Sequence, residues 1–155
     1  MGDVAMAVPV LSAFVKQYPQ IQITVLTRVF FKPMFHTLPN VTVFEADVKG
    51  KHRGFMGLWK LYKELKQEDF EGVADLHNVL RSKILKLFFG FGSVPFVQIE
   101  KGRKEKKALT AVKNKVFKPL KTTHDRYADV FSKLGYPIKL SDENVLSKQT
   151  LSSET

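Results

Sequence analysis

Runs of β-branched residues alternate with amphipathic helical segments along most of this chain. The runs that predict strands are 21–27, 41–46, 73–77 and 94–99, and the segments that predict helices are 4–18, 30–38, 58–66, 79–89 and 124–134. Strands separated by helices are typical of an α/β fold with a parallel sheet of the doubly wound type. Such a unit normally begins with a strand, whereas this chain begins with a helix that contains Pro9, where a kink or a late start of the regular helix is expected.

The charge of the chain is strongly unbalanced, with 25 Lys and Arg against 15 Asp and Glu and a formal net charge of +10. This excess indicates an anionic partner, either nucleic acid, an acidic membrane surface, or a phosphorylated or carboxylated substrate, unless it serves solubility alone. The chain contains no Cys, which excludes disulfides, thiolate catalysis and Cys-based zinc sites. The four His residues lack metal-ligand spacing, so no metal site is predicted.

The sequence shows neither a membrane span nor a leader peptide. No apolar run approaches the ~20 residues that a transmembrane helix needs. The first residues lack a basic segment followed by an apolar one. A cytoplasmic protein of one domain is therefore expected.

Gly2 and Asp3 come directly before the first predicted helix. In open α/β sheets, ligands bind at the carboxyl ends of the strands, and the loop between the first strand and the first helix is the prime position. Glycine allows close approach of a ligand to the backbone, and the helix N-terminus favours anionic groups. Asp3 could act there as a general base. The competing interpretation, which the bare sequence favours, is that Asp3 is only an N-cap at the start of the helix.

The stretch DLHNVLRSK (75–83) places polar residues at the end of the third predicted strand. Asp75 and His77 alternate along this strand, and Arg81 and Lys83 follow in the first turns of the next helix. Basic side chains at a strand's carboxyl end suit an anionic ligand. A capped helix with solvated basic residues is the competing interpretation, and a catalytic pair of Asp75 and His77 is the weaker one.

Residues 100–121 contain nine Lys or Arg and two Glu, with Phe117 as the single aromatic residue. Proteins that bind single-stranded nucleic acid usually interleave several stacking aromatics, so nucleic acid is disfavoured as a partner. The run fits attraction to phosphates or lipid headgroups as well as a solvated basic surface. The chain has no P-loop and no G-x-G-x-x-G motif.

Four stretches resemble, in the same order, motifs of glycosyltransferase family 9, the bacterial lipopolysaccharide heptosyltransferases. MGDVAMAVPVLSAF (1–14) is similar to the family's M-G-D-V and the helix with P-x-L that follows it. FEGVADLHNVLRSKIL (70–85) resembles the family's Y-D-x-x-I-D-x-Q segment. GRKEKK (102–107) and THDRYADVFSKLGY (123–136) resemble its acceptor-side basic loop and the helix that precedes L-G.

The resemblance implies that residues 1–140 form the N-terminal, acceptor-binding half of a two-domain GT-B enzyme, with a Rossmann-like doubly wound sheet. It also implies that the family's first strand, central in a 3-2-1-4-5 order, is missing before residue 1. Residues 141–155 would be a polar tail or an interdomain linker. The family's C-terminal domain binds the nucleotide-sugar and carries D-[ST]-G-x-x-H-x-A, which does not occur in residues 1–155. The chain alone is expected to be inactive.

The resemblance further implies transfer of heptose, with inversion, from ADP-heptose to the inner core of lipopolysaccharide. Asp3 matches the family's candidate base, and Gly2 would leave room for the substrates. The acceptor carries phosphates and carboxylates, so its predicted contacts are the basic residues Arg81, Lys83, Arg103 and Lys104. No cofactor and no metal is implied. The remaining lysines favour the anionic inner face of the cytoplasmic membrane.

Departures from the family pattern leave some positions without a role. Family members often have Gln where His77 falls, and the spacing of His124 and Arg126 is tighter than in the family. The net charge of +10 and the basic run at 100–121 support the main alternative, a stand-alone basic α/β module that binds RNA or anionic lipid. A different GT-B or Rossmann-like enzyme is another.

Overall fold

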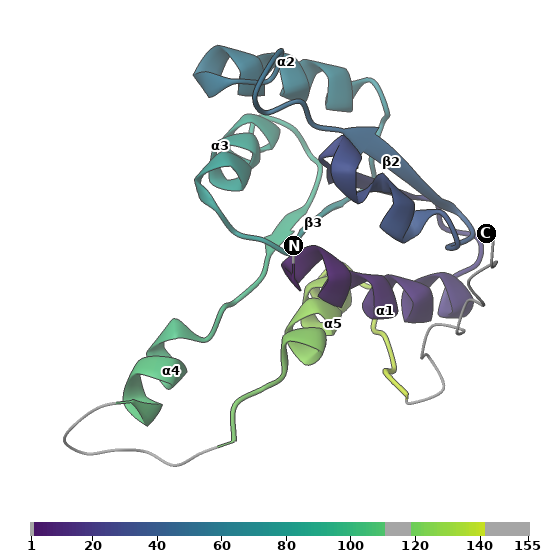
Figure 1. The fold of residues 1–155 in the computed structure, drawn as a ribbon, viewed down its shortest axis with the longest axis vertical. Helices are drawn as coiled ribbons and strands as arrows, with labels where there is room; N and C mark the ends of the chain where they lie inside the picture. Colours follow the sequence, from purple (N-terminus) through teal and green to yellow (C-terminus); the bar gives the residue numbers. More distant parts are fainter. Residues whose placement is uncertain (1, 111–118, 142–155) are drawn as a thin grey trace, which may run out of the picture.

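The computed structural model describes residues 2–110 and 119–141, and helices and strands alternate over most of them (Figure 1). The elements in chain order are α1 (Gly2–Gln17), β1 (Ile23–Thr27), the 3-10 helix η1 (Val29–Phe35), β2 (Val41–Glu45), α2 (Gly54–Lys66), β3 (Val73–Asp75), α3 (Leu80–Phe89), β4 (Phe96–Gln98), α4 (Arg103–Leu109) and α5 (Thr123–Lys133). All four predicted strands and all five predicted helical segments are confirmed, with shorter strands than expected. The tail predicted at 141–155 lies, apart from its first residue, outside the described residues.

The four strands form two parallel pairs. In one pair, Val25 of β1 lies opposite Val43 of β2. In the other, Ala74 of β3 lies opposite Val97 of β4. No strand bridge joins the two pairs within residues 2–110 and 119–141, so the single doubly wound sheet that was predicted is not present there. The sequence pattern of each strand predicts that it is extended, but it does not specify which strands become neighbours in space.

Alternate strand residues pack into two different apolar clusters, because successive side chains of a strand point to opposite faces. Ala74 and Val97 pack against the cluster built from α1, η1 and α5, whereas Val73 and Phe96 pack against the cluster built from α2 and α3. Figure 1 shows α2 and α3 on one side of the strands and α1 and α5 on the other. The strands are therefore covered by helices on both faces.

Helix α1 continues through Pro9 from Gly2 to Gln17, so of the two outcomes expected at Pro9, a kink or a late start, the late start is wrong. Proline cannot donate to the carbonyl of Ala5, four residues back. Ala5 is exposed, so water can satisfy that carbonyl. The second half of α1 is buried nearly all round, with Val10 and Ala13 fully enclosed, because it packs between η1 and α5.

The structure differs from expectation at two further helices. Helix α2 begins at Gly54, four residues before the start of the helical segment predicted at 58–66. Helix α4 lies inside the basic run and was not predicted, because its sequence RKEKKAL lacks the apolar spacing of an amphipathic helix. In Figure 1, α4 projects away from the rest of the fold.

Candidate functional site

The turn after β3 is built around the buried carboxylate of Asp75. Its Oδ1 accepts hydrogen bonds from the backbone N–H of His77 (2.9 Å) and Asn78 (2.8 Å), and its Oδ2 accepts one from Gln98 Nε2 (2.8 Å). Burial acts to raise the pKa of Asp75, but the polar Ser82 side chain nearby and the hydrogen bonds from these donors outweigh it and hold the pKa below its ordinary value. Asp75 is therefore an ionised structural group that shapes the turn.

This turn brings His77 to the first turn of α1. His77 Nδ1 lies 3.2 Å from Asp3 Oδ2, and the side chains of both residues are more than half exposed. The backbone of α1 is held from the other side, because the Tyr127 hydroxyl donates to the Asp3 carbonyl oxygen over 3.3 Å. Burial, and secondarily the nearby Asp3 charge, raise the pKa of Tyr127, so this hydroxyl stays protonated and remains a donor.

Asp3 forms part of the wall of a pocket of about 150 Å³. The other polar groups on this wall are Lys101, Lys106, Thr123, Arg126 and Tyr127. Asp3 lies in the first turn of α1 and Thr123 begins α5, so the N-termini of two helices contribute partial positive charge here. The pocket therefore combines one exposed carboxylate with a cationic wall.

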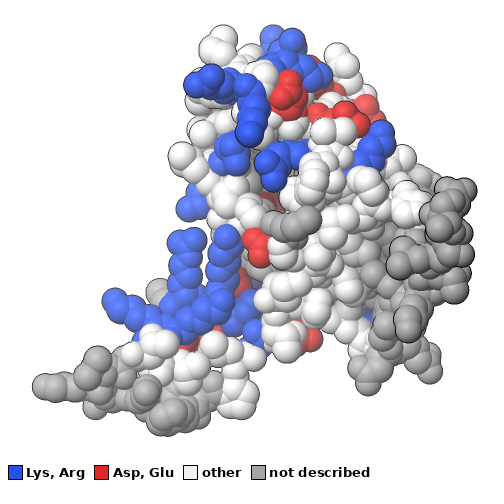
Figure 2. All heavy atoms as spheres, in the orientation of Figure 1, with Lys and Arg blue, Asp and Glu red and all other residues white. Residues whose placement is uncertain are grey.

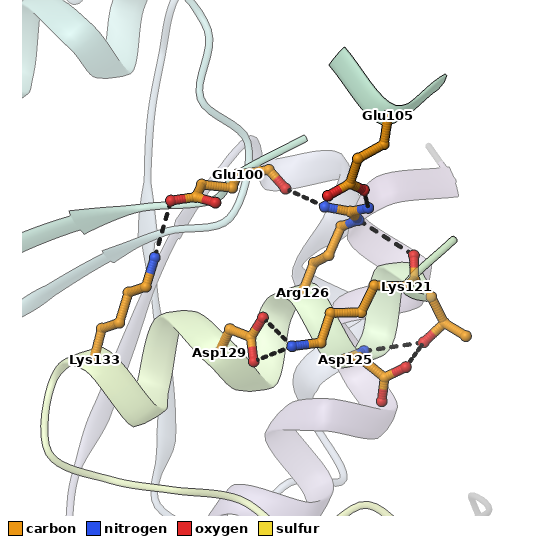
Figure 3. A network of polar contacts seen from close by, with 8 residues as sticks. Glu100, Glu105, Lys121, Asp125, Arg126, Asp129 and Lys133 are labelled. Atoms are coloured by element: carbon orange, nitrogen blue, oxygen red, sulfur yellow. Dashed lines mark hydrogen bonds and ion pairs between the residues drawn. The ribbon is translucent and has the colours of Figure 1, made fainter. Parts of the chain in front are cut away.

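The three guanidinium nitrogens of Arg126 all donate hydrogen bonds to other groups of the protein (Figure 3). Its Nη2 donates to Glu105 Oε2 (2.6 Å), its Nη1 to the Glu100 carbonyl (3.0 Å) and its Nε to the Lys121 carbonyl (3.2 Å). The guanidinium thereby connects α5 to α4 and to the segment after β4. Lys101 and Lys106, by contrast, pair with no carboxylate in the described part of the chain, so they are the cations available to a ligand.

Gly102 allows Arg126 to occupy this position. Its φ is +59°, in the left-handed region, and it precedes the first residue of α4. A Cβ at this position would overlap the Arg126 guanidinium. Glycine is therefore favoured at this position for two reasons, the left-handed backbone conformation and the close packing of the Arg126 guanidinium.

The residues predicted from the sequence are not all near Asp3. Gly2 is exposed beside it, and a Cβ there would meet no atom of the described fold, which leaves this space open. Arg81 and Lys83 are exposed in the first turns of α3 and do not line the Asp3 pocket. Arg103 begins α4, and the side chain of Lys104 lies outside the described residues.

Sequence reasoning missed several groups that the fold assembles around Asp3. His77 was noted as a strand-end residue, but nothing in the sequence indicated its contact with Asp3. Lys101 and Lys106 belong to the predicted basic run, which was the available signal, although other residues of that run were chosen. The role of Tyr127 could not be found, because a buried tyrosine on a helix has the spacing of an ordinary core residue.

Two further findings concern ligands and membranes. In residues 2–110 and 119–141, no group of three or more His, Asp or Glu has the arrangement of a metal site. Over the same residues, no helix combines the length and apolarity that crossing a membrane requires.

The comparisons with known proteins point to a glycosyltransferase. No protein-family model matches the chain, and no solved structure matches it significantly. The chain is similar to the lipopolysaccharide core heptosyltransferase OpsX of Haemophilus influenzae, with 29% identity over 87 residues. These residues make up 56% of this chain but only 24% of that protein, so the match spans about a quarter of the relative. The similarity indicates a relationship to the glycosyltransferases.

Proposed function

We propose that this chain is the acceptor-binding part of an inverting glycosyltransferase that moves heptose from ADP-heptose to the inner core of lipopolysaccharide. The main support is the exposed carboxylate of Asp3, which lies beside the end of β3 in contact with His77. The similarity to a lipopolysaccharide core heptosyltransferase supports the reaction class. The nucleotide-sugar would be bound by residues that are not part of residues 1–155.

In this mechanism Asp3 is the general base. One of its oxygens takes the proton of the acceptor hydroxyl while the hydroxyl oxygen attacks the anomeric carbon. The bond between that carbon and the nucleoside diphosphate breaks on the opposite face, which inverts the configuration. A proton on His77 Nδ1, 3.2 Å from Asp3 Oδ2, would orient the carboxylate so that its other oxygen faces the acceptor.

The acceptor would be held through its negative charges. Lys101 and Lys106 line the pocket beside Asp3 without a carboxylate partner in the described part of the chain, so we add them to the proposed acceptor contacts. Arg81, Lys83, Arg103 and Lys104 remain proposed contacts for parts of the acceptor that extend beyond this pocket. Phosphates and carboxylates suit such side chains.

A chimeric enzyme tests the role of Asp3. Residues 1–155 would be joined to the part of OpsX that the similarity does not cover, and heptose transfer from ADP-heptose would be measured. Asp3→Asn should lower kcat by about 10²–10⁴-fold, the usual contribution of a general base. Asp125→Asn, which also changes an aspartate in the first turn of a helix, should leave kcat unchanged.

Two outcomes would contradict the proposal. If Asp3→Asn transfers heptose at the rate of the unchanged chimera, Asp3 is not the base. If purified residues 1–155 transfer heptose alone, the nucleotide-sugar site lies within this chain and the two-domain interpretation is wrong. Binding of a phosphorylated inner-core oligosaccharide to residues 1–155 gives an independent readout, and Lys101→Ala with Lys106→Ala should weaken it.

A further inference from the structure

Helices α2 and α3 expose large apolar side chains. Phe55 and Met56 begin α2 with exposed fractions of 60% and 75%. Leu80 and Leu87 lie on α3, and Phe91 follows its end with an exposed fraction of 82%. Leu80 and Leu87 are seven residues apart, which places their side chains on one face of α3, separate from its buried residues Leu85, Phe88 and Phe89. Together the five exposed residues form what we call the apolar rim.

Most of the apolar rim gathers at one end of the helix pair. The Phe55 ring packs against Phe88 of α3 with a centroid distance of 5.4 Å, which brings the start of α2 to the end of α3. Leu87 and Phe91 lie at that same end of α3. The adjoining ends of α2 and α3 therefore carry four exposed apolar side chains, and exposed apolar residues that gather in this way mark an interaction surface.

The segments that contain the apolar rim are also strongly basic. Residues 48–63 contain five Lys or Arg and residues 79–92 contain three, and neither segment contains an Asp or Glu. Figure 2 shows Lys and Arg side chains over α2 and α3, and separately over α4. Arg53, Arg81 and Lys83 form no ion pair with a carboxylate in the described part of the chain. These three side chains therefore flank the apolar rim with positive charge, whereas Lys51 is paired with Glu64 of α2.

We propose that the apolar rim and its flanking basic residues dock this protein on the surface of a membrane that contains anionic lipids. An exposed apolar face bordered by Lys and Arg is the combination that binds a lipid interface, since the apolar side chains enter the headgroup boundary while the cations attract anionic headgroups. This proposal rests on α2 and α3 alone and does not depend on the transferase activity.

The composition of the rim distinguishes a membrane from other anionic partners. Three of the five rim residues, Met56, Leu80 and Leu87, offer aliphatic surface, which lipid accommodates but which cannot stack on nucleic-acid bases as the rings of Phe55 and Phe91 could. Helix α4 has a similar charge density but shows no large exposed apolar side chain among its described residues. We therefore infer that α2 and α3 contact the membrane, and that the charge of α4 attracts soluble anions.

Vesicle binding by the polypeptide of residues 1–155 tests the proposal. It should sediment with vesicles of phosphatidylcholine mixed with phosphatidylglycerol, and much less with phosphatidylcholine alone, and added salt should weaken the binding. Trp59 provides an intrinsic probe, because it is the only tryptophan and its ring packs on Phe88 at 4.9 Å. Its emission should shift to shorter wavelength when vesicles bind.

Surface variants separate the apolar and the charged contributions. Leu87→Ser combined with Phe91→Ser should lower the partition coefficient by about tenfold or more. Lys83→Glu should lower it by about fivefold or more. Phe30→Ser is the matched apolar control, because Phe30 is 66% exposed on η1, and Lys16→Glu on α1 is the matched charge control. Neither control should change vesicle binding.

Three results would overturn the proposal. The first is equal binding of the rim variants and the controls. The second is the absence of any preference for anionic vesicles. The third is that the rim variants leave vesicle binding intact but abolish another interaction. Loss of binding to a single-stranded oligonucleotide would assign the surface to RNA. Loss of a dimer detected by light scattering would assign it to a second copy of the chain. Circular dichroism confirms that each variant is folded.

Discussion

Gly102→Ala should be the most destabilising of the glycine substitutions in the left-handed region. Alanine at a φ of +59° costs about 1–2 kcal/mol because its Cβ approaches the following carbonyl oxygen. The Cβ also displaces the guanidinium of Arg126, whose side chain is only 9% exposed and makes three hydrogen bonds. Losing one such bond to a charged group costs about 1.5–3 kcal/mol. The expected total is about 2.5–5 kcal/mol.

Gly54→Ala provides the matched control for this substitution. Gly54 has a similar φ of +68°, but a Cβ there would meet no other atom within 4 Å. Gly54→Ala should therefore lower the free energy of unfolding only by the backbone strain, about 1–2 kcal/mol. The difference between the two variants isolates the displacement of Arg126.

The free energy of unfolding would be measured by urea denaturation followed by circular dichroism. A stabilising osmolyte keeps the weaker variant folded at the start of the titration. Repeating Gly102→Ala in an Arg126→Met background completes a double-mutant cycle, and its cost there should fall to that of Gly54→Ala. If Gly102→Ala and Gly54→Ala cost the same in the unchanged chain, close packing against Arg126 is not what requires glycine.

Two other predictions concern stability. Asp75→Asn should lower the free energy of unfolding by about 1–3 kcal/mol at neutral pH, because an amide cannot accept from all three donors. The folded pKa of Asp75 is lowered, so this contribution is present above about pH 4 and is lost as the pH falls through the folded value, where the two denaturation curves should converge. The polypeptide of residues 1–155 should be marginally stable, because β1 and β3 each have a single strand partner among the described residues. A sharp cooperative calorimetric melt of the monomer above ~60 °C would contradict this.

The helices and strands were predictable where local sequence decides them. VTVFE of β2 is β-branched and apolar, and α2 has an apolar stripe at helical spacing. Helix α4 was not predictable because tertiary contacts hold it, among them the ion pair of Glu105 with Arg126. The division into two strand pairs was not predictable either, because pairing depends on which strands become neighbours in space.

The sequence predicted Asp3 as a residue of the candidate site, but it did not predict which side chains contact Asp3 or line its pocket. Asp3 was singled out because a Gly-Asp pair before a helix is a local pattern. The contact of Asp3 with His77 depends on the turn that Asp75 organises. In the sequence, the residues of this turn look the same as those that precede any helix, so the turn could not be predicted. The choice between Lys101 and Arg103 depends on how α4 is oriented, which Gly102 and Arg126 determine.

The position of Asp3 follows from the parallel arrangement of β3 and β4. Both strands end at the same edge, so the turn that presents His77 and the segment that presents Lys101 leave the strands side by side. Helices α1 and α5 begin at the same pocket, where Asp3 and Thr123 lie on the wall. A carboxylate at this edge is thus surrounded by cations from separate elements, while the apolar rim lies on α2 and α3, which cover the other face of the strands. The proposed base and the apolar rim therefore lie on different helices, so substitutions of the rim's apolar side chains can alter membrane contact without changing Asp3, whereas Arg81 and Lys83 of α3 are shared by the two proposals.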